Sequence, residues 1–179
     1  RGKYNYCYCT KSSHFSYVGK EVLKHDVEIE TSSSFDIDLV RRLFEEEFIG
    51  KETIIVNNGF KTHEYAEKIC SLINEGFENV IPVLDNKEEL AYYEEMVKGQ
   101  CNLGIRVATD EEPNFEFYTS RLGLRPSEII SFCKERIESN PKFNLTMLHF
   151  FVDTGIKDTI HYWGGLKKAV KMYCELKKV

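Results

Sequence analysis

The sequence lacks the features of membrane, secreted and nucleic-acid-binding proteins. No apolar run in its 179 residues approaches the roughly 18 residues that a membrane span needs, and nothing in it resembles a signal peptide. Basic residues are not in excess, because 24 Lys and Arg stand against 29 Asp and Glu, which gives a net charge of −5. A basic arm for nucleic acid is therefore excluded. We expect a cytoplasmic protein with no nucleic-acid or membrane partner.

Glycine-rich nucleotide-binding loops are also missing. Neither GxGxxG nor GxxxxGK[ST] occurs, and the residues that follow the first strand-like segment read Lys-Ser-Ser-His. With four prolines and 11 glycines, the chain contains no Gly/Ser/Pro-rich linker, and its composition does not shift along its length. The sequence therefore predicts one domain over residues 1–179.

Cysteine is present six times, but without the spacing of a secreted disulfide scaffold. The cysteines lie in apolar, periodic segments at Cys7, Cys9, Cys70, Cys101, Cys133 and Cys174. We interpret them as reduced thiols of the core. The Cys7-x-Cys9 pair lacks the further ligands that a metal site needs, so no metal site is predicted.

Short β-rich runs alternate with longer segments of helical period. Strands are predicted at Tyr4–Thr10, Val27–Thr31, Thr53–Asn57, Asn79–Leu84, Asn102–Ala108 and Asn144–Phe151. Helices are predicted at His14–Lys24, Phe35–Phe48, His63–Glu75, Lys87–Lys98, Pro126–Ser139 and Lys157–Lys177. Thr62 suits an N-cap, and Pro126 suits a first helical turn.

Strict strand–helix alternation predicts an α/β fold with parallel strands, since each helix returns the chain to the same edge of the sheet. A (β/α)8 TIM-type barrel takes roughly 250 residues for eight units, so six units would take roughly 190. We therefore expect six of the eight βα units of such a barrel. On this interpretation residues 1–179 are a single, partial barrel domain, and the remaining strands lie outside the chain.

In such a barrel the active site lies at the carboxyl ends of the strands. Lys11 follows the first strand, where partial desolvation would lower its pKa and give a neutral amine that can attack a carbonyl. That step anchors pyridoxal phosphate as a Schiff base. The alternative is an ordinary solvated lysine at a strand end, and spacing alone does not decide between the two.

Five blocks resemble the pyridoxal-phosphate decarboxylases of the alanine-racemase fold, and most closely the biosynthetic arginine decarboxylases. They occur in family order as Tyr8-Cys9-Thr10-Lys11-Ser12-Ser13, Glu30-Thr31-Ser32-Ser33, Asn58-Gly59-Phe60-Lys61, Ser120-Arg121-Leu122-Gly123-Leu124 and Leu148-His149-Phe150. These are similar to the family's Tyr-x-x-Lys-x-Asn, acidic-Ala-Ser, Asn-Gly-Tyr-Lys, Ser-Lys-Phe-Gly-Leu and Leu-His-Phe-His segments. Each block is short, but together they span nearly the whole chain.

The resemblance implies roles for individual residues. Lys11 would hold the cofactor as the internal Schiff base, and Glu30 and Arg106 would bracket its ring and ring oxygen. Thr154 stands where a phosphate-binding serine is usual, and Arg121 matches a basic residue used across a dimer interface. The resemblance thus implies pyridoxal 5′-phosphate as cofactor and a homodimer or higher homo-oligomer. Magnesium is suggested by the resemblance alone.

The sequence also departs from the family. Phe151 replaces the histidine that stacks on the cofactor ring, and Asp153 stands where the family has glycine. A phenyl ring can stack, but it cannot donate a hydrogen bond. His149 lies two residues earlier on the same strand face, either as a cofactor-binding group or as a satisfied core histidine. The glycine-rich phosphate loop, the carboxylate for the pyridine nitrogen and the C-terminal β-domain are not in the sequence.

The predicted activity is decarboxylation of arginine to agmatine for polyamine synthesis, carried by a longer protein and acting on a small amino-acid substrate. One alternative is a related decarboxylase that acts on ornithine, diaminopimelate or carboxynorspermidine. The other is a catalytically silent barrel homologue that binds and regulates a partner. Retention of Lys11 with Glu30 favours an enzyme, whereas Phe151 and Asp153 favour the silent homologue.

Overall fold

A computed structural model describes residues 4–108, 122–151 and 159–178. These contain six parallel strands that pair in chain order, β1-β2-β3-β4-β5-β6. The strands are β1 (Cys7–Cys9), β2 (Glu28–Thr31), β3 (Ile55–Asn57), β4 (Val80–Leu84), β5 (Cys101–Val107) and β6 (Phe143–Phe150). Sequential parallel order confirms the barrel-type α/β fold, and the sheet is not closed.

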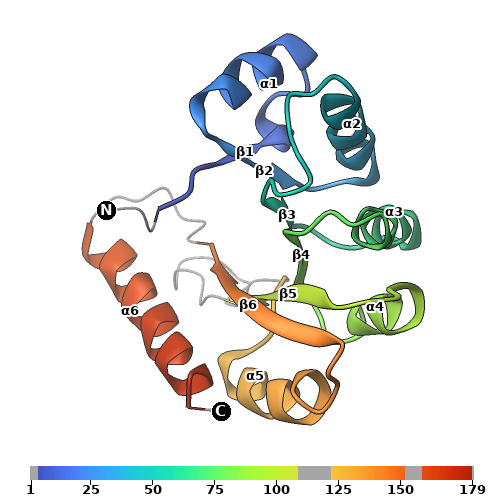
Figure 1. The fold of residues 1–179 in the computed structure, drawn as a ribbon. Helices are drawn as coiled ribbons and strands as arrows, with labels where there is room; N and C mark the ends of the chain where they lie inside the picture. Colours follow the sequence, from blue (N-terminus) through green and yellow to red (C-terminus); the bar gives the residue numbers. More distant parts are fainter. Residues whose placement is uncertain (1–3, 109–121, 152–158, 179) are drawn as a thin grey trace.

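A helix follows each strand. The helices are α1 (Ser16–Val22), α2 (Ser34–Glu45), α3 (His63–Asn74), α4 (Leu90–Met96), α5 (Pro126–Phe132) and α6 (Thr159–Leu176). Figure 1 shows α1 to α5 along one side of a curved sheet, with α6 beyond β6. None of the described helices is both long and apolar enough to cross a membrane.

Helix α3 shows how local sequence sets an element's ends. The Thr62 hydroxyl accepts a hydrogen bond from the Tyr65 backbone N–H at 3.2 Å, which confirms the predicted N-cap. Ile69 and Leu72 share the buried face with Tyr65, as helical spacing requires. Gly76 follows with a φ of +87°, a conformation in which glycine avoids the steric cost of a Cβ. The helix therefore ends where the sequence predicts.

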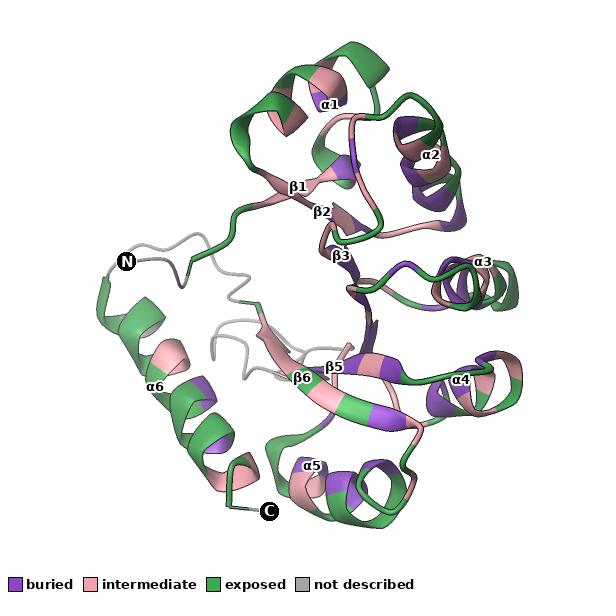
Figure 2. Cartoon of the chain, viewed as in Figure 1, coloured by how far each residue is buried: buried purple, intermediate pink, exposed green. Residues whose placement is uncertain are grey.

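The core lies between the sheet and its covering helices. Ile55 of β3, Leu84 of β4 and Ile105 of β5 are completely buried, as are Ile37 of α2 and Ile69 of α3. Figure 2 shows buried residues on the strands and on the helix faces toward them, while the outward helix faces are exposed. Burial of this apolar surface stabilises the arc of βα units and holds the strand ends in place.

Several predicted boundaries were too generous. The first strand begins at Cys7 rather than Tyr4, because its pairing with β2 starts at Cys7 and Glu28. Helix α4 begins at Leu90 rather than Lys87, because the preceding turn has 3-10-type backbone bonds, in which the N–H groups of Leu90 and Ala91 donate to the carbonyls of Lys87 and Glu88.

All six cysteines are free, as predicted. Burial raises the pKa of Cys70 and Cys101 to about 12, so both thiols stay protonated. The core assignment was wrong for Cys174, which is exposed on α6, and Cys7 and Cys9 are only half-buried. β1 is a short edge strand of the described sheet, so its side chains have fewer neighbours than those of β3 or β5.

Candidate functional site at the strand ends

The carboxyl ends of the six strands meet at one edge of the sheet, since the strands are all parallel. Glu30 lies near the end of β2, and Arg106 and His149 are paired neighbours near the ends of β5 and β6. Lys11 lies in a 3-10 turn, Thr10–Ser12, directly after β1. Four predicted site residues therefore share this edge.

Lys11 is exposed to solvent in the described part of the chain. The prediction that its amine is partly desolvated was therefore wrong. The reason is positional, because Lys11 follows an edge strand that has β2 on one side. The neighbouring Thr10 is buried, and its hydroxyl donates to the Glu30 carbonyl at 3.1 Å. That bond fixes the base of the Lys11 turn against β2.

Asn58 joins Glu30 to His149 across the strand ends. Its Nδ2 lies 3.0 Å from Glu30 Oε1 and 3.2 Å from His149 Nε2. Asn58 directly follows β3, so the contact links side chains from β2, β3 and β6. We call Glu30, Asn58 and His149 the amide bridge.

The environment of His149 disfavours its protonation. Burial, together with the positive charges of Arg106 and Lys61, lowers the pKa of His149 to about 4. The imidazole is therefore neutral near pH 7. Its Nδ1 is buried and has no hydrogen-bond partner among the described residues. The sequence left open that His149 is a core histidine with both ring nitrogens hydrogen-bonded. The unpartnered Nδ1 does not fit that alternative among the described residues.

A buried ionic cluster lies beside the amide bridge and consists of Lys61, Asp85, Glu89 and Arg106. Lys61 Nζ lies 3.8 Å from Glu89 Oε2, and Arg106 Nη1 lies 3.7 Å from Asp85 Oδ1. Burial lowers the pKa of Lys61 and raises the pKa of Asp85 and of Glu89, whereas the attraction between the opposite charges opposes these shifts. The Arg106 side chain is only 13% exposed, so Asp85 holds a largely desolvated guanidinium.

Phe151 follows β6 and lies near Arg106. The Arg106 guanidinium carbon is 5.9 Å from the centre of the Phe151 ring, within cation–π range. Phe151 and His149 thus approach the same neighbour, as their spacing of two residues predicts. Thr154, Arg121 and Asp153 lie outside the described residues.

A buried polar network fixes the backbone of Asn58. Its N–H donates to the Thr31 carbonyl at 2.9 Å, and its carbonyl accepts from the Tyr65 hydroxyl at 3.3 Å. The Thr31 hydroxyl also bonds to the Tyr65 hydroxyl and to Asn57 Nδ2, each at 2.8 Å. Asn58 is therefore anchored to β2 and α3 before its side chain reaches the bridge.

Asn58 and Asp85 follow strands, at positions where the sequence places the active site of such a barrel, but they were given no individual role, and Lys61 and Glu89 were not assigned to the site at all. Asn58 and Lys61 stand in the Asn-Gly-Phe-Lys block, and Asp85 directly follows β4. A strand-end position combined with a family block was the available signal. Glu89 precedes α4, and only its contacts with Lys61 and Asp85 bring it to the cluster.

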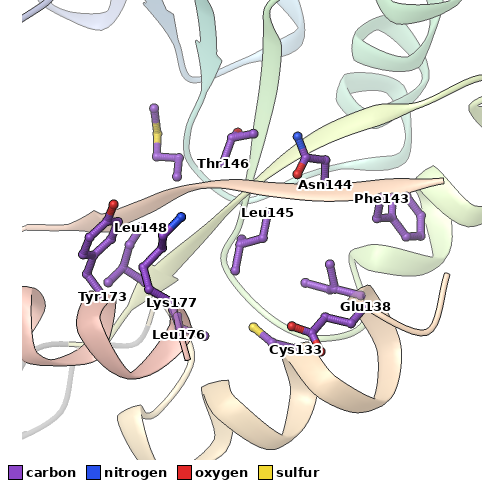
Figure 3. A pocket seen from close by; sticks show the side chains of 12 residues that line it. Cys133, Glu138, Phe143, Asn144, Leu145, Thr146, Leu148, Tyr173, Leu176 and Lys177 are labelled. Atoms are coloured by element: carbon purple, nitrogen blue, oxygen red, sulfur yellow. The ribbon is translucent and has the colours of Figure 1, made fainter. Parts of the chain in front are cut away.

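A pocket of about 340 Å³ lies elsewhere, between β6, α6 and the π-helical segment Cys133–Ile137. Figure 3 shows Leu145 and Leu148 of β6 facing Tyr173 and Leu176 of α6 there. None of the predicted site residues lines it. The pocket is therefore separate from the strand-end site.

The strand-end residues fit an anionic, aromatic cofactor. Asn58 Oδ1 and His149 Nδ1 are buried polar atoms without a hydrogen-bond partner among the described residues. Such atoms are costly unless a ligand or water satisfies them. Arg106 adds positive charge, Phe151 adds an aromatic face and Lys11 adds an accessible amine. Pyridoxal phosphate needs a covalent amine, ring contacts and charge complementarity, and these residues offer all three.

Comparison with protein-family models finds no match for this chain. The sequence is 28% identical over 137 residues to biosynthetic arginine decarboxylase of Prochlorococcus marinus, covering 72% of this chain and 21% of that protein. It is 27% identical over 133 residues to arginine decarboxylase 1A, chloroplastic, of Nicotiana tabacum, covering 70% of this chain and 18% of that protein. The chain thus spans about a fifth of the length of these curated relatives.

Solved structures share the fold. Diaminopimelate decarboxylase of Helicobacter pylori, complexed with L-lysine, superposes with a TM-score of 0.78 at 15% identity, over 97% of this chain and 44% of that one. Biosynthetic arginine decarboxylase of Campylobacter jejuni gives 0.68 at 22% identity, over 99% of this chain and 29% of that one. The chain therefore shares the fold of part of these decarboxylases, and its sequence is similar to biosynthetic arginine decarboxylases.

Proposed function

We propose that this chain contributes six βα units to the barrel of a pyridoxal-phosphate-dependent decarboxylase, and that the complete protein converts arginine to agmatine for polyamine synthesis. The observation that carries the proposal is the amide bridge, which joins Glu30 and His149 at the strand edge that Lys11 also occupies. The similarity to named arginine decarboxylases supports arginine as the substrate. A homodimer and a cytoplasmic location remain part of the proposal.

Each residue has a proposed task. Lys11 holds the cofactor through its amine, Glu30 contacts the ring, and Arg106 supplies positive charge near the ring oxygen. Phe151 packs against the ring in place of a histidine, and Thr154 binds the phosphate. When bound, pyridoxal phosphate supplies the electron sink for loss of the carboxylate. Arg121 contributes across the dimer interface.

The residues also control protons and water at the edge. His149 is neutral and does not compete with the substrate amine for a proton near pH 7. Asp85, 3.7 Å from Arg106, partly balances the charge of the guanidinium, which would face the anionic ligand. The Asn58 amide donates a hydrogen bond to Glu30 Oε1, which keeps the Glu30 side chain from turning toward solvent. These tasks are orientation and electrostatics.

The test is covalent trapping on Lys11 in the complete protein. We expect visible absorbance that borohydride bleaches, and digestion should recover the reduced pyridoxyl group on Lys11. Lys11→Ala and Lys11→Arg should both lower carbon dioxide release from arginine by orders of magnitude, because neither offers a neutral amine. Lys20→Ala and Lys24→Ala are controls for a general loss of positive charge. Undiminished release from Lys11→Ala would overturn the proposal.

Substrate choice is measured in the same assay with arginine, ornithine, diaminopimelate and carboxynorspermidine. Arginine should give the highest kcat/KM. A silent homologue is the second candidate, favoured by Phe151 at the position of the stacking histidine. It would show neither bleachable absorbance nor carbon dioxide release with any of the four.

A further inference from the structure

The amide of Asn58 has only one orientation that satisfies both of its partners. Glu30 presents a carboxylate, which only accepts hydrogen bonds, so the atom 3.0 Å away must be the NH2 group. The same nitrogen lies 3.2 Å from His149 Nε2. An NH2 group carries two hydrogens, one for each contact, and it has no lone pair to offer.

This orientation of the Asn58 amide determines which ring nitrogen of His149 carries the proton. Because Asn58 donates, Nε2 must accept with a free lone pair, and the imidazole proton must lie on Nδ1. A doubly protonated ring would set two donors against each other. Hydrogen bonds to Thr31 and Tyr65 hold the backbone of Asn58 beside the contact.

We propose that Asn58 is a positioning residue that holds His149 as the Nδ1–H tautomer and so presents a hydrogen-bond donor to an anionic oxygen of the bound cofactor or substrate. The identity of the ligand rests on the proposed function, whereas the tautomer of His149 does not. His149 Nδ1 is buried and has no hydrogen-bond partner among the described residues, so its N–H is available to donate to a ligand. Arg106, its neighbour on β5, favours an anionic acceptor.

The tautomer is measured directly in the cofactor-free complete protein, with 15N-labelled histidine, by long-range correlation between ring protons and ring nitrogens at pH 7. We expect Nδ1 of His149 at the shift of a protonated nitrogen and Nε2 at that of an unprotonated one. A protonated Nε2, alone or together with Nδ1, would overturn the inference. This measurement needs no variant, so it decides even if a variant fails to fold.

Asn58→Leu removes the donor while it keeps the approximate size of the side chain. Leucine offers no hydrogen bond and the Glu30 carboxylate remains nearby as an acceptor, so the His149 proton should move to Nε2. Asn144→Leu is the matched control, since Asn144 is exposed near the start of the same strand and bonds to Asn102. An unchanged Nδ1–H ring in Asn58→Leu would overturn the inference, as would the same change in the control.

Adding ligands identifies the acceptor. A shift of the Nδ1 signal with pyridoxal phosphate alone assigns the acceptor to the cofactor. A shift that appears only after arginine is added to a Lys11→Ala holoprotein assigns it to the substrate, and no shift in either case overturns the donor role. Failure of trapping on Lys11 with the predicted tautomer intact would reject the proposed function alone, so the two failures are distinguishable.

Discussion

Lys61 and Glu89 form a buried ion pair that ties the ends of β3 and β4 together. Lys61 Nζ lies 3.8 Å from Glu89 Oε2 and donates to the carbonyls of Gly59 and Val83, at 2.5 Å each. The Glu89 carboxylate in turn accepts the backbone N–H groups of Lys61 and Asp85, both at 3.0 Å. One of the Lys61 contacts, to Gly59, thus lies in the loop that carries Asn58, and the other, to Val83, lies in β4.

Lys61→Met should destabilise this region strongly, because it leaves the Glu89 carboxylate buried without its cation. Breaking one side of a buried pair typically costs about 3–5 kcal/mol. Native-state hydrogen exchange of residues 55–90 should show that loss of protection. Restoration of protection by adding Glu89→Gln would confirm that the uncompensated charge is the cause.

The matched control is Lys68→Met. Lys68 pairs with Asp38 at 2.7 Å on the surface, where an ion pair is worth about 1 kcal/mol or less. Protection in the control should therefore change little. Equal losses in the Lys61 and Lys68 variants would contradict a special role for the buried pair.

Gly59→Ala should disturb the amide bridge through the backbone. Gly59 has a φ of +80°, and an added Cβ would lie 3.2 Å from the Ser32 carbonyl oxygen. Left-handed strain costs roughly 1–2 kcal/mol in a non-glycine residue, and the close contact adds to it. We expect weaker exchange protection around Asn58 and a changed His149 ring signal. Gly99→Ala, with nothing within 4 Å, should show neither effect.

His149 should titrate near pH 4, well below the ordinary value of about 6.5. Between these two values the unfolded chain binds a proton that the folded protein does not bind. Stability from this group is therefore full above pH 6.5 and is lost as the pH falls toward 4, up to roughly 3 kcal/mol. NMR titration of the ring measures the pKa, and Arg106→Gln should raise it by removing a positive neighbour.

The predicted effect of His149 on stability is measured as the loss of folding stability at acid pH. His149→Gln removes the titrating ring, so that variant should lose less stability than the wild type between pH 7 and pH 4.5. His25→Gln, at an exposed position, should behave as the wild type. A His149 pKa at or above 6.5 would contradict the burial that the structure shows.

Phe151→Ala should weaken binding of pyridoxal phosphate, because an aromatic face near Arg106 is lost. Aromatic contacts contribute about 1 kcal/mol beyond burial, which corresponds to roughly a fivefold to tenfold rise in Kd. Phe151→His keeps a ring and should keep the affinity. Phe35→Ala, at an exposed position on α2, is the control. Unchanged affinity in Phe151→Ala would remove Phe151 from the cofactor site.

Much of the fold was predictable because it depends on local patterns. The β-rich runs and helical periods placed six strands and six helices, and the Thr62 cap followed from its side chain. Boundaries were less predictable at β1 and α4, where strand pairing and 3-10-type backbone bonds decide the ends. Lys11, Glu30, Arg106 and His149 could be assigned to one edge because parallel strands all end on the same side.

The sequence by itself determined the parallel α/β architecture and the set of residues at the strand ends, because periodicity and chain order are local properties. Only the tertiary structure decided which of those residues meet. Asn58 and His149 are 91 residues apart, and their contact depends on the curvature of the whole sheet. The same packing buried Lys61 and left Lys11 exposed, although both are lysines that follow a strand. Burial, and with it each pKa, is set by neighbours that are distant in the chain.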